Sequence, residues 1–288
     1  RYALLKKAFV RFQKNLPEDY AVFCEKEKEW LDEYTLFMAL KDANDGKAWA
    51  EWDKDLRIRK PEALNKARVG YAEDIEFYKM LQYLFFKQWR ELKAYANENG
   101  IDIFMNMYHF DMPEYLYKRG GWANREVVEA YANFVKKAME EFGGKVKYWF
   151  TFNEPIVEPE QQYLHGVWFP YEKNIKRSLD VQYNITLAHC LAVMNFRELQ
   201  AEGKMVEGAK IGMINCFAPP YTKEDPSPED LEAVRMTDGL HNRWWLDVVA
   251  HGHLPKDVID TVENEWKIKM NRRPGDEAIL AGGKVDWL

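Results

Sequence analysis

The segment Tyr148–Pro155 has the sequence YWFTFNEP and joins an apolar run to a carboxylic acid. Aromatic residues dominate the run, which predicts a buried β-strand. Asn153 and Glu154 follow it directly, and Pro155 fixes the turn by which the chain leaves the strand. An apolar setting favours the protonated form of a carboxyl group, which is the form that donates a proton in catalysis. The alternative is that Glu154 caps a helix or is solvated in a loop.

Short apolar runs alternate with amphipathic helices from Ile101 to the end of the chain. The runs cover residues 101–107, 146–152, 210–215 and 284–288, and the helices between them cover about 125–141, 178–201 and 227–250. This order predicts a parallel sheet with crossover helices. Polar or aromatic residues follow most of the runs, at the carboxyl ends of strands, where barrel enzymes build their sites.

The first hundred residues have a helical character. Leu5, Ala8, Phe9 and Phe12 recur at helical spacing, and longer helices are expected over residues 21–40 and 72–97. Residues 42–46 and 60–61 punctuate this region, and a residue after a helix with positive φ is predicted at position 100, which is glycine. We therefore predict a helical segment over residues 1–100 and a partial barrel over residues 101–288.

The charge and composition exclude several classes of partner. The 288 residues carry a net charge of −6, and the basic residues are spread along the chain, which argues against nucleic acid. No apolar run is long enough to cross a bilayer and no signal peptide opens the chain, so no membrane partner is predicted. Cys24, Cys190 and Cys216 lie far apart without a CxxC motif. They indicate neither a disulfide framework nor a metal site; no cofactor is predicted, and a reducing cytoplasm is the simplest location.

Three motifs lie around the predicted strands: YHFDMP at residues 108–113, GGW at 120–122 and WFTFNEP at 149–155. Together they closely resemble glycoside hydrolase family 1, the family of β-glucosidases and 6-phospho-β-glucosidases. The resemblance runs from about Ile103 to Leu288. It also includes Ala188-His189, Asn215 with Tyr221, the WWLD run at 244–247 with Gly252 and Pro255, and the final KVDWL run at 284–288.

The resemblance implies a fold and a set of site residues. Members are (β/α)₈ barrels that retain anomeric configuration, so this α/β chain would hold an incomplete TIM barrel, about the third to sixth strands. Glu154 would be the acid/base, Asn153 would contact the sugar 2-hydroxyl and His109 a ring hydroxyl. Phe110 stands where many members have tryptophan, and Asn215 would also face the sugar. The remaining histidines are interpreted as structural or surface residues: His165, His189, His241, His251 and His253.

The family's nucleophile is a glutamate in a Glu-Asn-Gly motif after a late strand, which would lie beyond Leu288. Glu98-Asn99-Gly100 has this sequence, but it ends a helix and precedes the strand at Ile101. Glu98 would therefore lie at the amino end of that strand, opposite the catalytic face, and we reject it as the nucleophile. The chain opens with Arg1 rather than Met and ends within a strand-like run, so we expect an inactive fragment of a longer chain.

The first third carries a different set of motifs: LLKKAF at 4–9, WLDEY at 30–34, LFMALK at 36–41, WAEW at 49–52, QYLFFKQW at 82–89 and LKAYAN at 92–97. These resemble 4-α-glucanotransferases (amylomaltases, glycoside hydrolase family 77) from Arg1 to about Ile103. In that family this helical region leads into a barrel strand that continues as Gly-Asp-Leu-Pro. Here the strand continues as FMNMYH, so the transferase's catalytic carboxylates, which follow that point, are absent.

The sequence therefore predicts β-glycosidase chemistry on a small carbohydrate. The run INCFAPPY at residues 214–221 favours a 6-phospho-β-glucoside as the substrate. Two alternatives stay open, a 4-α-glucanotransferase fragment and a non-catalytic carbohydrate-binding fragment. The oligomeric state is not predicted.

Overall fold

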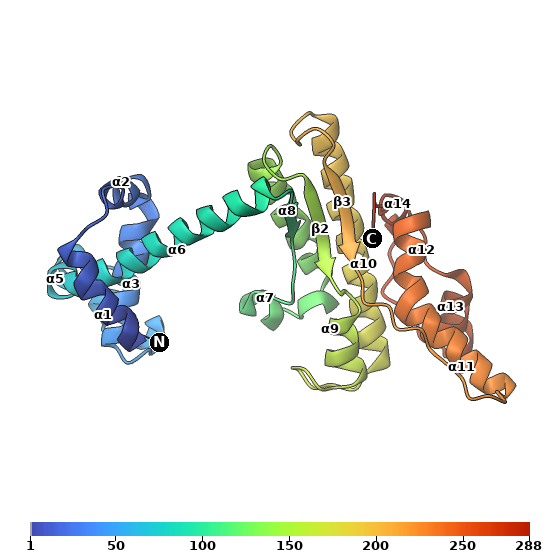
Figure 1. The fold of residues 1–288 in the computed structure, drawn as a ribbon. Coiled ribbons are helices and arrows are strands. Elements are labelled where there is room, and N and C mark those ends of the chain that lie inside the picture. The colour runs from blue at the N-terminus through green and yellow to red at the C-terminus, as the bar shows by residue number, and fades with distance from the viewer. Residues whose placement is uncertain (1) are drawn as a thin grey trace. The chain divides into compact units, whose positions relative to one another are not determined.

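The computed structural model describes residues 2–288, and the chain divides after Ile101 into two compact units (Figure 1). The first unit is built from helices. These are α1 (Tyr2–Lys14), α2 (Tyr20–Lys26), α3 (Lys28–Ala43), η1 (Trp49–Glu51), α4 (Lys54–Arg57), α5 (Pro61–Gly70) and α6 (Ala72–Glu98).

Apolar clusters between these helices form the core of the first unit. Leu40 of α3 and Leu64 of α5 are buried in one cluster. Another contains Tyr20, Leu31 and Tyr83 from α2, α3 and α6, and the rings of Tyr20 and Tyr83 meet edge to face with centroids 5.4 Å apart. Aromatic rings bury large apolar areas, so these contacts account for much of the packing between the helices.

The helix boundaries differ from the sequence prediction at two points. A single helix was expected over residues 21–40, but Glu27 separates α2 from α3. The break lets Phe23 and Leu31 reach the same cluster. Pro61, expected only to punctuate the chain, is the first residue of α5, where its missing N–H is not needed. Gly100 has φ +65°, as predicted for the residue that follows a helix.

The second unit contains a parallel sheet in the order β1-β2-β3. The strands are β1 (Phe104–Asn106), β2 (Tyr148–Asn153) and β3 (Lys210–Ile214). α8 (Arg125–Phe142) connects β1 to β2, and α10 (Ile175–Ala201) connects β2 to β3, as the alternating pattern predicts. Shorter pieces complete the unit: α7 (Glu114–Lys118), η2 (Gly121–Ala123), α9 (Val157–Pro159), η3 (Glu160–Leu164), α11 (Pro228–Asp238), η4 (Gly239–Arg243), α12 (Trp244–His251), α13 (Lys256–Asp260), η5 (Thr261–Glu265) and α14 (Asp276–Ala281).

The two faces of the sheet bury different residues. Trp149 of β2 and Ile211 of β3 are fully buried in the large apolar cluster that also contains Val135 of α8 and Phe196 of α10. Phe104, Tyr148, Phe150 and Trp287 form a separate aromatic group, with centroids 4.8 Å apart between Phe104 and Tyr148 and 4.9 Å between Phe150 and Trp287. Alternation of side chains along a strand produces this separation.

Two of the predicted strands are shorter than expected. The run 101–107 forms a strand only at Phe104–Asn106, where β2 supplies a partner on one side. The run 284–288 makes only an isolated parallel bridge from Trp287 to Gly212 of β3. A Cβ atom at position 212 would lie 2.6 Å from the Trp287 carbonyl oxygen, so only glycine admits this approach. The described residues thus form three strands and one isolated parallel bridge.

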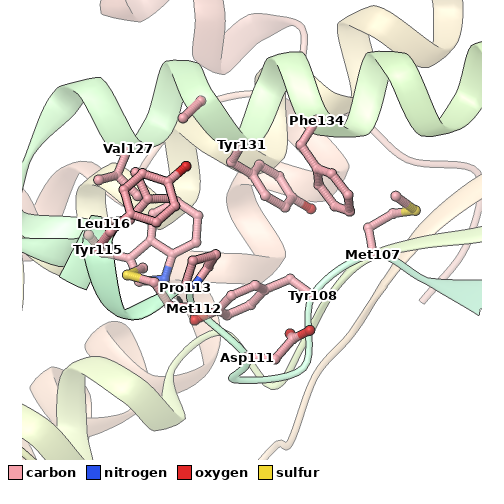
Figure 2. A pocket seen from close by; sticks show the side chains of 12 residues that line it. Met107, Tyr108, Asp111, Met112, Pro113, Tyr115, Leu116, Val127, Tyr131 and Phe134 are labelled. Carbon is pink, nitrogen blue, oxygen red and sulfur yellow. Dashed lines mark hydrogen bonds between the residues drawn. The ribbon is translucent and has the colours of Figure 1, made fainter. Parts of the chain in front are cut away.

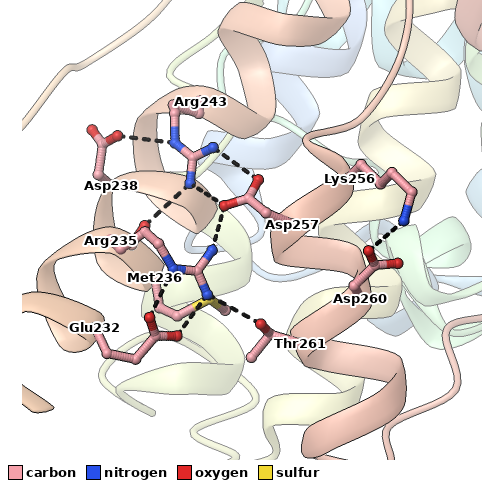
Figure 3. A network of polar contacts seen from close by, with 9 residues as sticks. All are labelled: Glu232, Arg235, Met236, Asp238, Arg243, Lys256, Asp257, Asp260 and Thr261. Atoms are coloured by element: carbon pink, nitrogen blue, oxygen red, sulfur yellow. Dashed lines mark hydrogen bonds and ion pairs between the residues drawn. The ribbon is translucent and has the colours of Figure 1, made fainter. Parts of the chain in front are cut away.

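Ion pairs hold the helices that follow β3 (Figure 3). The Arg243 guanidinium donates two hydrogen bonds of 2.9 Å to the carboxylate of Asp257 and one of 3.1 Å to Asp238. Arg235 also binds Asp257. Because two guanidinium groups stabilise its charged form, the pKa of Asp257 lies well below its usual range. The network joins α11, η4 and α13.

Candidate active site

The carboxyl ends of the three strands bring most of the predicted site residues to one edge of the sheet. His109 follows β1, Asn153 and Glu154 end and follow β2, and Asn215 follows β3. The backbone N–H of Asn153 donates to the Tyr108 carbonyl (3.0 Å), and that of Glu154 donates to the Ile214 carbonyl (2.8 Å). Ladder bonds to both neighbouring strands therefore fix the backbone that carries the candidate acid.

Two residues at this edge have left-handed backbone conformations. Glu154 has φ +45° and Phe110 has φ +67°. Such a conformation in a residue with a side chain costs about 1–3 kcal/mol, and it persists only where the surroundings impose it. Residues of this kind cluster at functional sites, so their occurrence at both turns supports the choice of this edge.

Aromatic rings extend from the turn after β1. The backbone N–H of His109 donates to the Asp111 carboxylate (3.0 Å). The imidazole ring of His109, an exposed residue, lies edge to face with the Phe110 ring, with 5.2 Å between the ring centroids. Phe110 in turn contacts the ring of Trp168 at 5.4 Å. Trp168 was not predicted as a site residue, because nothing in the sequence indicates that residues near position 168 return to the turn after β1.

The turn after β3 carries an amide without partners. Both polar side-chain atoms of Asn215 are buried and lack a hydrogen bond. Buried amides are normally bonded, so Asn215 is an exception that stands out at this edge. Burial and then the nearby charge of Glu154 raise the pKa of the adjacent Cys216 thiol, which indicates that this turn lies close to the candidate acid.

His241 holds the same turn from the other side. Its Nδ1 lies 2.8 Å from a carboxylate oxygen of Glu160, and its Nε2 lies 3.1 Å from the Cys216 carbonyl. The hydrogen bond to Glu160 raises the pKa of His241 against the opposing effect of burial. His241, predicted from the sequence to be a structural or surface residue, is bonded beside the candidate site.

His189 is buried beneath the sheet. Its Nδ1 lies 2.7 Å from the Thr151 hydroxyl, and its Nε2 lies 3.0 Å from the Gly283 carbonyl. Because a carbonyl can only accept, Nε2 carries the proton and Nδ1 accepts from Thr151. Burial lowers the pKa of His189 to about 4, so the ring is neutral. It therefore joins α10, β2 and the segment before Trp287.

Glu158 was also absent from the sequence predictions. Its buried carboxylate accepts hydrogen bonds from Tyr108 (2.9 Å), Trp122 (3.1 Å) and Gln162 (3.1 Å). Tyr108 immediately precedes His109, and Glu158 lies on α9, just after the Glu154 turn.

Among residues 2–288, no group of three or more His, Cys, Asp or Glu side chains is arranged to hold a metal ion. No helix within this range is long and apolar enough to cross a membrane.

A pocket of about 320 Å³ lies beside the turn after β1 (Figure 2). Its walls are largely apolar and include Met107 and Tyr108 just after β1, Leu116 of α7, and Tyr131 and Phe134 of α8. Glu154 and Asn153 do not line it. The pocket is therefore distinct from the edge that carries the candidate acid.

Comparison with known proteins identifies relatives for both parts of the chain. The family model for glycosyl hydrolase family 1 matches residues 85–288, and that for 4-alpha-glucanotransferase matches residues 1–134. The 6-phospho-beta-glucosidase GmuD of Bacillus subtilis is 39% identical over 167 residues, which are 58% of this chain and 34% of that protein. The 4-alpha-glucanotransferase of Clostridium butyricum is 40% identical over 126 residues, 43% of this chain and 25% of that protein.

Solved structures give the same result for the barrel part. The beta-glucosidase BglU of Micrococcus antarcticus is 30% identical with a TM-score of 0.57, and the match covers 73% of this chain and 41% of that one. The family 1 beta-glucosidase of Thermotoga maritima has a TM-score of 0.54 at 27% identity, covering 74% and 43%. The chain thus spans less than half the length of these relatives. It belongs to glycosyl hydrolase family 1, as an incomplete (β/α)₈ barrel preceded by a helical segment that resembles 4-alpha-glucanotransferase.

Proposed function

We propose that this chain carries the acid/base half of a β-glycosidase active site, with Glu154 as the proton donor to the glycosidic oxygen. The observation that carries the proposal is the fixed backbone of Glu154, which has φ +45°. The Glu154 N–H donates to the Ile214 carbonyl of β3, and the N–H of the preceding Asn153 donates to the Tyr108 carbonyl after β1. His109 and Asn215 follow those two neighbouring strands at the same edge. A sugar held there would meet an acid, an imidazole and two amides.

A retaining mechanism needs a second carboxyl group about 5 Å from the acid, as the nucleophile. The described carboxylates of the neighbouring turns are already engaged. Asp111 accepts the backbone N–H of His109, Glu158 is buried under three hydrogen-bond donors, and Glu160 is bonded to His241. Glu98 ends α6, before the amino end of β1. We infer that the nucleophile is supplied by sequence outside these 288 residues, and we expect this chain alone to hydrolyse β-glucosides very poorly.

We further infer a preference for 6-phospho-β-glucosides. The similarity to a 6-phospho-beta-glucosidase at 39% identity supports this preference, and a Beta-glucosidase A from Acetivibrio thermocellus at 31% identity supports the unphosphorylated alternative. The segment that resembles 4-alpha-glucanotransferase keeps transfer between α-glucans as the second candidate. The third is carbohydrate binding without catalysis.

Binding and turnover separate these candidates. Backbone NMR spectra should be recorded with glucose 6-phosphate, glucose and maltotriose. We expect the phosphorylated sugar to shift the amide signals of His109, Asn153 and Asn215 most strongly, and Glu154→Gln to weaken the effect. Shifts confined to the unit that ends at Ile101, with maltotriose alone, would favour the transferase. Robust turnover of nitrophenyl β-glucoside with retained configuration would show that a second carboxylate lies within the chain.

A further inference from the structure

The Glu158 carboxyl is one of the most enclosed acidic groups of the barrel unit, with the residue 5% exposed. All three of its partners approach as donors: the Tyr108 hydroxyl, the Trp122 indole N–H and the Gln162 amide. The Trp122 N–H is shared with the Tyr108 oxygen at 3.2 Å, so that oxygen already accepts a hydrogen bond. The arrangement is therefore complementary to an ionised carboxylate, and protonation would place a further donor among donors.

This carboxyl connects the two turns that carry the candidate site. Tyr108 links it to the turn after β1, since His109 is the next residue and the Tyr108 carbonyl accepts the N–H of Asn153. α9 links it to the turn after β2, because the N–H of Val157 at the start of that helix donates to the Glu154 carbonyl at 3.0 Å. A change in the charge of Glu158 can thus affect both turns through one or two hydrogen bonds.

The groups around Glu158 leave its charge finely balanced. Burial raises the pKa of Glu158 to about 7, while the bonds from Tyr108, Trp122 and Gln162 oppose that rise. The other titratable groups that face it are Asp111, from the loop after β1, and the Tyr117 hydroxyl of α7. The Asp111 carboxylate adds a like charge and favours protonation of Glu158 further, and no cation is hydrogen-bonded to Glu158 among the residues described.

We propose that Glu158 is a positioning residue: its ionised carboxylate anchors Tyr108, and through Tyr108 holds the His109 turn against Asn153 and Glu154. The carboxylate does not touch the sugar in this arrangement. This role of Glu158 rests on the proposed function, because the anchored Tyr108 holds together the two turns that would bind the substrate. Protonation of Glu158 leaves a weaker, neutral acceptor for the Tyr108 hydroxyl and so loosens the His109 turn.

NMR titration tests the anchor without requiring catalysis or sugar binding. In the wild-type chain, the backbone amide signals of His109 and Asn153 should report a step near neutral pH. This step should coincide with the ionisation of the Glu158 carboxyl, which is observed directly by ¹³C labelling. In Glu158→Gln, the step should vanish from both amide signals. Glu126→Gln is the matched control, because the Glu126 side chain is 65% exposed on α8 and should leave the step unchanged.

Tyr108→Phe gives a second route should Glu158→Gln fail to fold. It keeps the carboxylate and the Trp122 and Gln162 donors but removes the link to the His109 turn, so Glu158 should still titrate while His109 no longer senses it. An unchanged His109 step in either variant would overturn the proposal. If glucose 6-phosphate binds, the ionisation of its own phosphate changes the affinity in both chains, and the fall between pH 8 and pH 6 should be several-fold larger in the wild type than in Glu158→Gln. Failure of all sugars to bind would count against the proposed function, whereas the His109 amide signal would still decide the role of Glu158.

Discussion

Removal of the Asp276 carboxylate should destabilise the barrel unit by about 4 kcal/mol. This carboxylate accepts hydrogen bonds from both terminal nitrogens of Arg125 (2.9 and 2.8 Å), from the Tyr183 hydroxyl (2.9 Å) and from the backbone N–H of Arg273 (2.8 Å). The Arg125 and Asp276 side chains are 8% and 6% exposed. The network joins α8, α10 and α14.

The magnitude follows from what Asp276→Ala would leave behind. An unpaired buried charge costs about 3–5 kcal/mol, and the unbonded Tyr183 hydroxyl adds about 1 kcal/mol. The Asn271 carbonyl, which accepts from Arg125 at 3.1 Å, and the Tyr183 ring, whose centroid lies 5.8 Å from the guanidinium carbon, recover part of this loss. Replacing both charges, as in Arg125→Met with Asp276→Ala, should restore about half or more of the stability, because no charge is then left buried.

Urea unfolding followed by tryptophan fluorescence measures the effect. Glu114→Ala is the control, since the Glu114–Lys118 pair is exposed and its loss should leave the urea midpoint unchanged. Burial is the largest single effect and would raise the pKa of Asp276, but the hydrogen bonds from Arg125, the Arg273 N–H and Tyr183, together with the charge of Arg125, outweigh burial and lower the pKa. The contribution of Asp276 to stability is therefore present above the unfolded pKa near 3.8 and is lost as the pH falls below that value. A cost below 1 kcal/mol for Asp276→Ala, or no recovery in the double variant, would refute the reasoning.

Three further outcomes are expected. Because burial depresses the folded pKa of His189 from 6.5 to about 4, the unfolded chain binds protons more readily, and stability should fall by about 3 kcal/mol between pH 6.5 and pH 4; a urea midpoint equally pH-dependent in His189→Gln would contradict this. The chain should associate at micromolar concentration, because β1 pairs on one side only among the described residues and Phe104 is 40% exposed. Sedimentation should show smaller species for Phe104→Lys than for the wild type, and a wild-type chain that sediments as a monomer would contradict this prediction. Gly212→Ala should cost about 1–3 kcal/mol by displacing Trp287, and an unchanged melting temperature would show that the bridge is dispensable.

The success of sequence-based prediction varied with how local each signal was. The aromatic run at residues 146–152 predicted β2, observed at Tyr148–Asn153, because a continuous apolar strand flanked by turn residues is legible without its neighbours. The motif that ends this strand also indicated the family to which the chain belongs. The strand predicted over residues 101–107 is longer than the observed β1, because a strand extends only as far as its hydrogen-bonded partner. Among the described residues β1 pairs only with β2, and only over Phe104–Asn106.

Contacts between distant residues were beyond reach of the sequence. Glu158 and Tyr108 are 50 positions apart, and no spacing rule relates them. His241 contacts Glu160, which is 81 positions away in the sequence. It lies in the π-helix η4, and the composition of this segment does not predict a π-helix. Apolar periodicity reports which face of an element is buried, but it cannot report which polar group on another element will lie opposite.

The edge with Glu154 can form in an incomplete barrel because local bonds define it. The N–H groups of Asn153 and Glu154 need only the carbonyls of Tyr108, just after β1, and Ile214 of β3, and no bond across the barrel is involved. The same three strands also account for the placement of His109 and Asn215. Closure of a barrel contributes what three strands cannot: a second carboxylate on the far side of the sugar and a wall that excludes water. We therefore expect sugar recognition by this edge to be separable from catalysis, and binding and turnover measurements on this chain test the two properties independently.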